Sequence, residues 1–259
     1  MKDFHLVVNA VKKSQMTSVM KSMMNLSVNL VWIRTTESGL MIVSVEIHIL
    51  QSHDEWLQAR SNRIGGSDAS AVVGMNPYKN NVELWMEKTG QVIPEDISDK
   101  PYVKYGTQAE MHLRGLFRLD FPQYQVEYIE NNMWLNEKFP FAHASLDGWL
   151  TDENGRKGIL EIKTTEILQS MQKEKWNHQI PDNYYIQILH YFAITEFEFA
   201  VLKAQLKTVF EGVPYLQTKH YFIERSDVED DIQYLMKEEE QFWQHIQSGK
   251  QPPLKLPSI

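Results

Sequence analysis

The sequence predicts an α/β protein in which a mixed central β-sheet is flanked by α-helices, and three patterns support this fold class. Apolar runs on both sides of a turn-rich segment, residues 151–158, indicate a β-hairpin. Apolar residues recur at helical spacing over residues 103–119 and again over 182–195. Strand-like runs occur at residues 43–49 and 197–206. Strands and helices therefore alternate along the chain, as they do in layered α/β domains.

Length and composition predict one large domain with an appendage. A chain of 259 residues is long enough for a substantial core, and 42% hydrophobic residues are typical of a globular protein. Residues 1–40 differ from the rest, because half of the twelve methionines fall within the first 41 positions and acidic residues are scarce there. We expect residues 1–40 to form a peripheral or irregular N-terminal extension, and residues 41–259 to form the functional domain.

Composition also excludes several classes of site. The chain has no cysteine, which excludes disulfides, thiolate zinc sites, Fe–S clusters and a cysteine nucleophile. Its net charge of −8 gives no overall attraction to nucleic acid, so contact with DNA would need a local basic patch. No apolar stretch approaches the ~18 residues that would cross a bilayer. We expect a cytoplasmic protein with no membrane partner.

The first predicted elements lead to a candidate anion site. Residues 43–49 alternate as a strand, and Ser52 opens a short helix that ends near Arg60. Two glycines at positions 65 and 66 precede Ser67, the expected N-cap of the next helix. Exposed backbone N–H groups at a helix start can bind a phosphate, and Arg60 lies close in sequence. The alternative is an ordinary capped helix with a flexible approach.

Two further helices precede the hairpin. Residues 82–88 form a helix that Gly90 stops. The helix over residues 103–119 carries Glu110 beside its apolar stripe. Glu110 is either a surface residue one step from the core or a carboxylate that reaches towards a metal. Short strands are expected at residues 124–128 and 133–135.

The loop of the hairpin decides whether a site exists, because the side chains of a strand alternate between its two faces. With a two-residue turn at Asn154-Gly155, Asp147 would lie opposite Ile162 and face away from Glu161. With a three-residue loop that ends in a left-handed Gly155, Asp147 lies directly opposite Glu161. The residues are compatible with both loops, and we expect the three-residue loop.

In that register two carboxylates and an ammonium group converge. Asp147 and Glu161 would repel each other unless a cation lay between them, and their oxygen ligands suit Mg²⁺ or Mn²⁺. Lys163 shares a strand face with Glu161 and could hold or activate a water for attack on a phosphodiester. Ser145 is expected on the same strand and face as Asp147. The alternative is a solvated hairpin whose charges serve only solubility.

Two helices are expected directly after the hairpin. The first spans residues 164–175, and the second spans residues 182–195. On the second helix Gln187 and Tyr191 are four residues apart and share one face. This polar pair could contact the DNA backbone or support the hairpin site.

The C-terminal part is expected to hold two strands and a final helix. The helix spans residues 228–246, ends near Gly249, and carries Glu238–Glu240 on a solvated face. The strands lie at residues 197–206 and 220–223, with a loop at 211–214 between them.

Five motifs follow one another between Trp56 and Leu206: Trp56-x-x-x-Arg60 with Gly65-Gly66-Ser67-Asp68, Gly106-x-x-x-Glu110, Ser145-x-Asp147, Glu161-Ile162-Lys163 and Tyr185-Ile186-Gln187. Their order and spacing resemble the phage lambda exonuclease family, the YqaJ-type viral recombinases of the PD-(D/E)xK nuclease group. The resemblance implies a restriction-endonuclease-like core. Leu146 stands where that group often has Pro, a departure that removes no metal ligand.

The resemblance also implies a role for each motif residue. Asp147 and Glu161 would bind a catalytic Mg²⁺, or Mn²⁺, with the backbone carbonyl of Ile162 as a further ligand. Glu110 would complete the acidic cluster, and Lys163 would orient or activate the attacking water. The residues around the 5′-phosphate of the degraded strand would be Arg60, Ser67, Ser145 and Gln187, with Tyr191 in a supporting role.

By this resemblance the chain is an exonuclease that digests linear double-stranded DNA from 5′-phosphorylated ends. It would leave 3′ single strands for a phage-type single-strand annealing protein, and a ring-shaped homotrimer would let DNA thread a channel. The alternatives are an endonuclease or junction-resolving enzyme of the same fold, and a non-catalytic scaffold that binds DNA ends.

Overall fold

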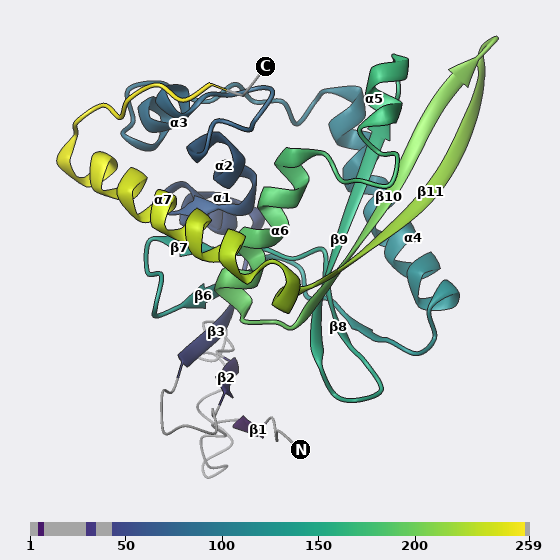
Figure 1. Cartoon of the computed structure of the whole chain (residues 1–259), viewed down its shortest axis with the longest axis horizontal. Helices are drawn as coiled ribbons and strands as arrows, with labels where there is room; N and C mark the ends of the chain where they lie inside the picture. Colours follow the sequence, from purple (N-terminus) through teal and green to yellow (C-terminus); the bar gives the residue numbers. More distant parts are fainter. Residues whose placement is uncertain (1–4, 8–29, 35–42, 257–259) are drawn as a thin grey trace, which may run out of the picture.

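A mixed five-stranded sheet forms the centre of the protein, as the computed structural model shows (Figure 1). The structure describes residues 5–7, 30–34 and 43–256. Strands β9 (Lys157–Glu166) and β10 (Phe199–Phe210) run parallel to each other, and the other neighbouring pairs are antiparallel. In spatial order the strands are β11 (Val213–Glu224), β10 (Phe199–Phe210), β9 (Lys157–Glu166), β8 (Gly148–Thr151) and β5 (Gln125–Glu127).

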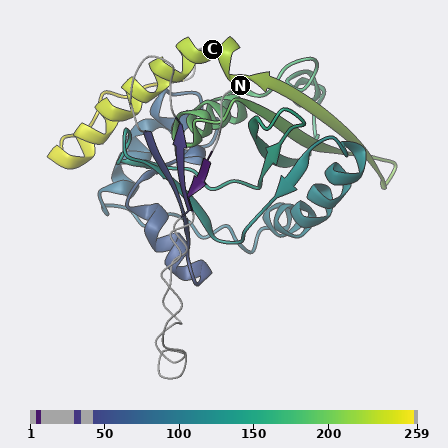
Figure 2. The ribbon, with the colours of Figure 1, turned by 90° about the horizontal axis from the view of Figure 1, so that it is seen from below.

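Helices cover both faces of this sheet (Figures 1 and 2). Helix α4 (Pro101–Asp120) packs on one face, and α6 (Asp182–Thr195) packs on the other. Helices α2 (Gly66–Val72) and α7 (Glu229–Ser248) lie against α6, so that α6 is buried along most of its length. The remaining described α-helices are α1 (His53–Ser61), α3 (Asn81–Lys88) and α5 (Ser170–Glu174).

Two smaller sheets complete the described strands. The larger has the order β1-β2-β3-β6, with β1 (His5–Val7), β2 (Leu30–Arg34), β3 (Val43–Ile49) and β6 (Asn132–Asn136). The smaller pairs β4 (Ile64–Gly65) with β7 (Ala142–His143). The expected extension over residues 1–40 lies outside the described residues except for β1 and β2. None of the described helices has the length and apolar character that crossing a membrane requires.

The alternation along β9 separates the core from the candidate site. Leu160 and Ile162 pack in a cluster with Leu113 and Phe117 of α4. Ile159 instead joins the larger core on the α6 side. Because side chains alternate along a strand, Glu161 and Lys163 share the α6 side with Ile159. The expectation that Leu160 and Ile162 face the core is confirmed.

The helix expected over residues 164–175 is wrong at its start. Strand β9 continues to Glu166, and only Ser170–Glu174 are helical. Thr164 pairs with Gln205, and Glu166 pairs with Lys207, so the neighbouring β10 extends the strand. Two consecutive threonines, which are β-branched, were a local sign of this extension.

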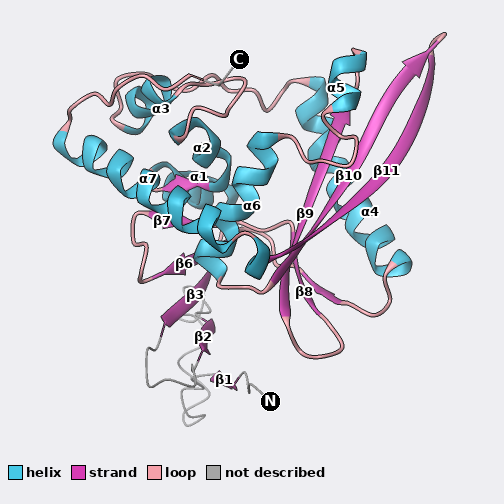
Figure 3. Ribbon diagram, in the orientation of Figure 1, coloured by secondary structure: helices cyan, strands magenta, loops and turns pink. Residues whose placement is uncertain are grey.

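The loop expected at residues 211–214 is also shorter than predicted. Strands β10 and β11 each run for 12 residues and meet at a two-residue turn, Glu211-Gly212. Both turn residues have positive φ, 49° and 78°, as hairpin turns of this length require. The paired strands extend well beyond the rest of the sheet as a long hairpin (Figure 3).

The acidic run on the last helix is not wholly solvated. Glu239 is fully buried, and its Oε1 lies 2.8 Å from Nδ1 of His190 on α6. The other ring nitrogen of His190 lies 2.8 Å from the carbonyl oxygen of His143. Three consecutive glutamates indicate solvent exposure, but the partner that draws Glu239 inward is 49 residues away in sequence.

Candidate active site

The hairpin that carries the candidate site has the three-residue loop. Asp152 N–H donates to the carbonyl of Arg156 at 3.1 Å, and Gly155 N–H donates to the carbonyl of Asp152 at 3.0 Å. Gly155 has a φ of 79°, the left-handed conformation that closes such a loop. Strand pairing then runs from Thr151 opposite Lys157 to Gly148 opposite Leu160. The next step of this register sets Asp147 opposite Glu161, which confirms the predicted loop.

Asp147 lies just before β8 rather than on it. The strand begins at Gly148, so the expected strand position of Ser145 and Asp147 is wrong. The backbone there is instead held by Asn132, whose amide accepts from Leu146 N–H at 2.9 Å and donates to its carbonyl at 3.0 Å. Asp147 Oδ2 accepts from Ile162 N–H at 2.8 Å, which ties it to the strand of Glu161. Sequence reasoning missed Asn132, because its partner is 14 residues away.

Glu161, Gln187 and Tyr191 are buried and form one cluster with the half-buried Lys163. Lys163 Nζ lies 2.6 Å from Glu161 Oε1, and Gln187 Nε2 donates to the same oxygen at 2.9 Å. Gln187 also donates to the Tyr191 hydroxyl at 2.8 Å. The predicted pair on α6 therefore supports the hairpin site directly. The ring of Tyr184, also on α6, lies 5.0 Å from Lys163 Nζ.

Glu110 approaches the cluster from the opposite helix, α4. Gly106, one turn earlier, brings α4 close to β9, because an added Cβ would lie 3.1 Å from Thr164 Oγ1. Arg114 donates to Glu110 Oε1 at 2.9 Å and also to the backbone carbonyl of Asp147. Sequence reasoning missed Arg114. The signal was its position four residues after Glu110, the spacing of an acid–base pair on one helix face.

The three carboxyl groups resist ionisation without a counter-charge. Burial raises the pKa of Asp147 to about 7, and the nearby Glu161 carboxylate adds to the rise. Burial and Asp147 likewise raise the pKa of Glu110 to about 7. Burial also raises the pKa of Glu161, although Lys163 opposes the rise. Burial lowers the pKa of Lys163, but Glu161 and Asp147 outweigh it, so its pKa lies above the ordinary value and its ammonium form persists.

The donor atoms suit a hard divalent cation. Glu161 Oε2 is buried and has no hydrogen-bond partner in the described structure. A cation beside it would offset both the burial and the repulsion that raise the carboxyl pKa values. Across residues 43–256, no three Asp, Glu, His or Cys side chains lie close enough to hold a metal by themselves. Asp147 and Glu161 would therefore need a backbone oxygen, such as that of Ile162, to complete a site.

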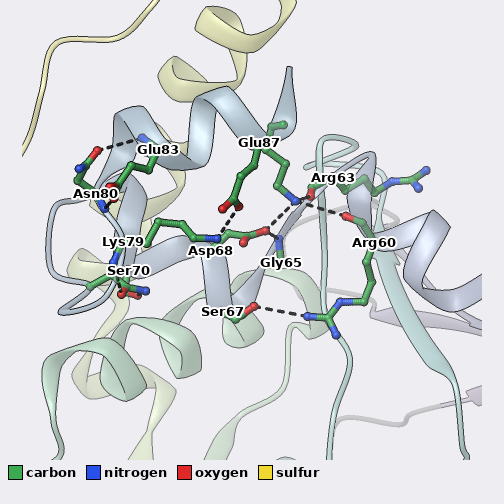
Figure 4. A network of polar contacts seen from close by, with 12 residues as sticks. Arg60, Arg63, Gly65, Ser67, Asp68, Ser70, Lys79, Asn80, Glu83 and Glu87 are labelled. Atoms are coloured by element: carbon green, nitrogen blue, oxygen red, sulfur yellow. Dashed lines mark hydrogen bonds and ion pairs between the residues drawn. The ribbon is translucent and has the colours of Figure 1, made fainter. Parts of the chain in front are cut away.

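A second group of predicted residues lies near this cluster. The Arg60 guanidinium donates to Ser67 Oγ at 3.4 Å (Figure 4) and stacks over Trp56, with Cζ 4.1 Å from the ring centroid. Trp56 Nε1 donates to Ser145 Oγ at 3.1 Å. Arg60, Ser67 and Ser145 are thus brought together through the indole of Trp56.

Ser67 is not the N-cap of its helix. Helix α2 begins at Gly66 and is capped by Gly65, whose N–H donates to Asp68 Oδ2 at 3.1 Å. Asp68 is held in turn by Lys88, whose Nζ lies 2.8 Å away. The Asp68 carboxylate completes the cap from inside the helix, and Ser67 is left exposed at the surface beside Arg60.

Gln187 lies with the acidic cluster rather than with Arg60, Ser67 and Ser145. The two groups adjoin at Gly66, where an added Cβ would lie 2.4 Å from Tyr191 Cε1 and 3.0 Å from Gln187 Cγ. Only a glycine allows this approach. The backbone next to Ser67 therefore touches the side chains that support Glu161.

The fold is restriction-endonuclease-like, and it is shared with an alkaline exonuclease. The alkaline exonuclease LHK-Exo of Laribacter hongkongensis matches with a TM-score of 0.58 at 18% identity, over 76% of this chain and 94% of that chain. The same exonuclease in complex with dAMP matches with a TM-score of 0.54 at 15% identity, over the same shares of both chains. At these identities the likeness establishes the fold.

Sequence comparison establishes the family. Residues 55–198 match the YqaJ-like viral recombinase domain. The uncharacterized protein YqaJ of Bacillus subtilis (strain 168) is 32% identical over 205 residues, which are 78% of this chain and 59% of that protein. The chain belongs to the YqaJ-like viral recombinase family, as its motifs predicted. It spans about three-fifths of the length of this relative.

Proposed function

We propose that this chain is a Mg²⁺-dependent exonuclease that hydrolyses phosphodiester bonds of linear double-stranded DNA from 5′-phosphorylated ends and leaves 3′ single strands. The observation that carries the proposal is the hairpin register, which sets Asp147 opposite Glu161 and Lys163 against Glu161. Membership of a viral recombinase family supports a DNA substrate and a role in recombination. Mn²⁺ has the same preference for oxygen ligands and could replace Mg²⁺.

In this proposal each residue of the cluster has a separate task. Asp147, Glu161 and the Ile162 carbonyl would hold the cation, which would stabilise the charge that develops on the phosphate. Lys163, whose pKa lies above its ordinary value, would orient the attacking water and neutralise charge rather than accept a proton. Gln187 and Arg114 would hold Glu161 and Glu110 in place.

The group at Trp56 is a suitable place for a 5′-phosphate. A terminal phosphate carries more negative charge than an internal one, and Arg60 could contact it with two N–H groups while Ser67 and Ser145 add hydroxyls. Contact with the terminal phosphate would draw the DNA forward after each cut. We further propose a ring-shaped trimer around the DNA and a single-strand annealing protein as the partner that receives the 3′ strand.

The decisive experiment is digestion of linear duplex DNA that carries either a 5′-phosphate or a 5′-hydroxyl, with circular DNA and EDTA as controls. We expect nucleotide release from the linear phosphorylated DNA only, and only with Mg²⁺ or Mn²⁺. Cleavage of the circle would favour the endonuclease or junction-resolving alternative. The Lys163→Ala variant, checked for folding, should lose nucleotide release. If the wild-type chain itself releases no nucleotides, the result would favour a non-catalytic scaffold.

The 5′-phosphate pocket is tested by Arg60→Ala, with Arg63→Ala as the matched control. Arg63 is the neighbouring arginine, and its side chain points away from Ser67 (Figure 4). Loss of a charge-assisted contact of about 1.5–3 kcal/mol should reduce the preference for 5′-phosphorylated over 5′-hydroxyl ends roughly tenfold or more in Arg60→Ala. Arg63→Ala should retain the preference. An unchanged ratio of the two rates in Arg60→Ala would exclude Arg60 from the pocket.

A further inference from the structure

A pocket lies between the start of α4 and the ends of β9 and β10. Its volume is about 210 Å³. Thr164 and Thr165 follow Lys163 directly on β9, and Tyr105 precedes Glu110 by five residues, or ~8 Å of helix rise. The two elements that carry the site residues therefore both continue into this pocket. The residues that line it are Pro101, Tyr102, Tyr105, Thr164, Thr165, Glu166, Gln205 and Lys207.

Exposed tyrosines line the pocket and lie near it. Tyr102 is 62% exposed and Tyr105 is 42% exposed, although both are large aromatic side chains. Tyr78 is 87% exposed, and the pKa of its phenol is raised by partial burial and then by the nearby Tyr184 and Tyr102. Tyr184 in turn faces the ammonium of Lys163. Folding does not require these rings at the surface, and gathered exposed aromatic groups indicate a binding surface.

The size and chemistry of the pocket suit one flat ring with a polar edge. A volume of 210 Å³ is below the range of about 300–1,000 Å³ that drug-sized ligands occupy. The Tyr105 hydroxyl donates to Gln205 Oε1 at 2.6 Å, which holds the amide at the pocket wall. Thr164 adds a hydroxyl, and Lys207, 3.6 Å from Glu166, adds a cation at the rim. Nucleobases combine a π-face with hydrogen-bonding edges, and aromatic side chains bind them by stacking.

We propose that this pocket binds an unpaired base of the DNA strand that is not degraded, and that the base stacks on Tyr102 or Tyr105. The proposal rests on the proposed nuclease function, because degradation of one strand of a duplex leaves the other strand unpaired near the active site. Stacking would accept any sequence, since every base presents a π-face. The pocket would then hold the DNA end between successive cuts.

The test uses the full chain in EDTA, so that no cleavage accompanies binding. The probe is a duplex with a short single-stranded extension that carries 2-aminopurine at each unpaired position in turn, because stacking quenches its fluorescence. We expect quenching for at least one position with the wild-type chain. Tyr102→Leu and Tyr105→Leu should lose the quenching and weaken binding by about fivefold or more, the lower end of what loss of base stacking costs.

Two variants serve as controls. Tyr105→Phe keeps the ring and should keep the quenching. Tyr234→Leu removes a tyrosine that is also 62% exposed but lies on α7, and it should leave quenching and affinity unchanged. Thermal unfolding of each variant checks the fold, which the exposure of Tyr102 predicts to be unaffected.

Unchanged quenching and affinity in both Tyr102→Leu and Tyr105→Leu would overturn the base pocket. An extension of abasic nucleotides that binds as tightly as the normal one would also overturn it, because binding would then depend on the backbone alone. Digestion with Mg²⁺ separates the two proposals. A chain that releases nucleotides without quenching contradicts only the pocket, whereas quenching through Tyr102 without nucleotide release contradicts only the nuclease.

Discussion

Glu161 shows how single contacts shape the site at the scale of residues. Its Oε1 is held by both Gln187 and Lys163, while its Oε2 is buried with no partner among the described residues. One oxygen is therefore positioned by the protein and the other remains available to a ligand. Asp147 has a similar division, because Ile162 N–H holds Oδ2. Of the groups that position the two carboxylates, only the Lys163 ammonium is charged. One negative charge is therefore left for a bound cation to compensate.

Asp147→Asn should separate metal binding from DNA binding. The amide oxygen can still accept from Ile162 N–H, so the hairpin should keep its register. Loss of one charged ligand should reduce metal-dependent nucleotide release by about 100-fold or more, while the affinity for DNA ends in EDTA stays within about twofold of the wild-type value. Mg²⁺ should raise the melting temperature of the wild-type chain but not of the variant. Equal turnover in both would contradict the ligand assignment.

Gly66 provides a second residue-scale prediction. In Gly66→Ala the new Cβ would meet the Tyr191 ring at 2.4 Å, so Tyr191 must move and Gln187 with it. We expect a loss of about 1–3 kcal/mol of stability and a larger fractional loss of turnover than of DNA binding. Gly115→Ala is the matched control. No atom lies within 4 Å of that new Cβ, so the helix should gain about 0.5–1 kcal/mol. Urea unfolding and single-turnover rates distinguish the two variants.

Among the residues of the site, those with a local pattern could be predicted and those with distant partners could not. The spacing of Glu161 and Lys163 shows directly that they share one face of their strand. The turn residues around Gly155 indicate the register of the β8–β9 hairpin. Arg114 and Asn132 act on backbone carbonyls 33 and 14 residues away, and a donor of that kind leaves no periodic trace.

At the scale of elements, contacts with neighbouring strands and helices determined features that local sequence preference does not predict. Helices α3, α6 and α7 begin and end near the predicted residues, because Asn80, Pro181 and Gly249 are local end signals. Strand β9 continues past Lys163 because β10 offers a parallel partner up to Lys207. Glu239 is buried because α7 packs on α6, where His190 faces it. Both outcomes depend on segments far away in sequence.

The contact between α6 and α7 should make stability depend on pH. Both ring nitrogens of His190 face acceptors, so only the imidazolium can donate to both. Burial lowers the pKa of His190, but Glu239 outweighs it and the pKa lies above its usual value. The resulting stability is fully present below the unfolded pKa of about 6.5 and is lost as the pH rises through the higher folded value.

Glu239→Gln should remove this dependence. We expect the variant to lose about 3 kcal/mol or more of unfolding free energy at about pH 6, as when a buried pair loses one charge. The difference from the wild-type chain should shrink at alkaline pH, because His190 loses its proton as the pH rises through its raised folded pKa. Urea unfolding at both pH values gives the difference directly, and other titrating groups cancel in it. A difference that does not vary with pH would contradict the charged pair.

At the scale of the whole molecule, the described structure is a sheet between α4 on one side and α6 on the other, with both site helices reaching the same hairpin. The role of residues 1–40 remains a prediction. Strand β2 pairs with β3, but β3 also pairs with β6 and so keeps one neighbour without the extension. The C-terminal tail is anchored separately, because Asn81 donates to the carbonyl of Pro253 at 2.7 Å.

A chain shortened to residues 41–259 should therefore stay folded and retain nucleotide release. We expect its unfolding free energy to change by no more than about 2 kcal/mol, a small part of the total for a domain. Circular dichroism and digestion of linear DNA measure the two properties, with the full chain as the reference. Collapse of the shortened chain would show that the N-terminal residues belong to the fold.

The loop at Glu153-Asn154-Gly155 has a consequence for how this hairpin tolerates insertions and deletions. Removing one residue from it would leave a two-residue turn, and adding one would leave a four-residue loop, and both can still close the Asp152–Arg156 pair and keep Asp147 opposite Glu161. Among variants of this chain, changes of loop length should therefore be tolerated here, whereas one residue inserted between Asp147 and Asp152, or between Arg156 and Glu161, should turn one carboxylate to the other face of the sheet.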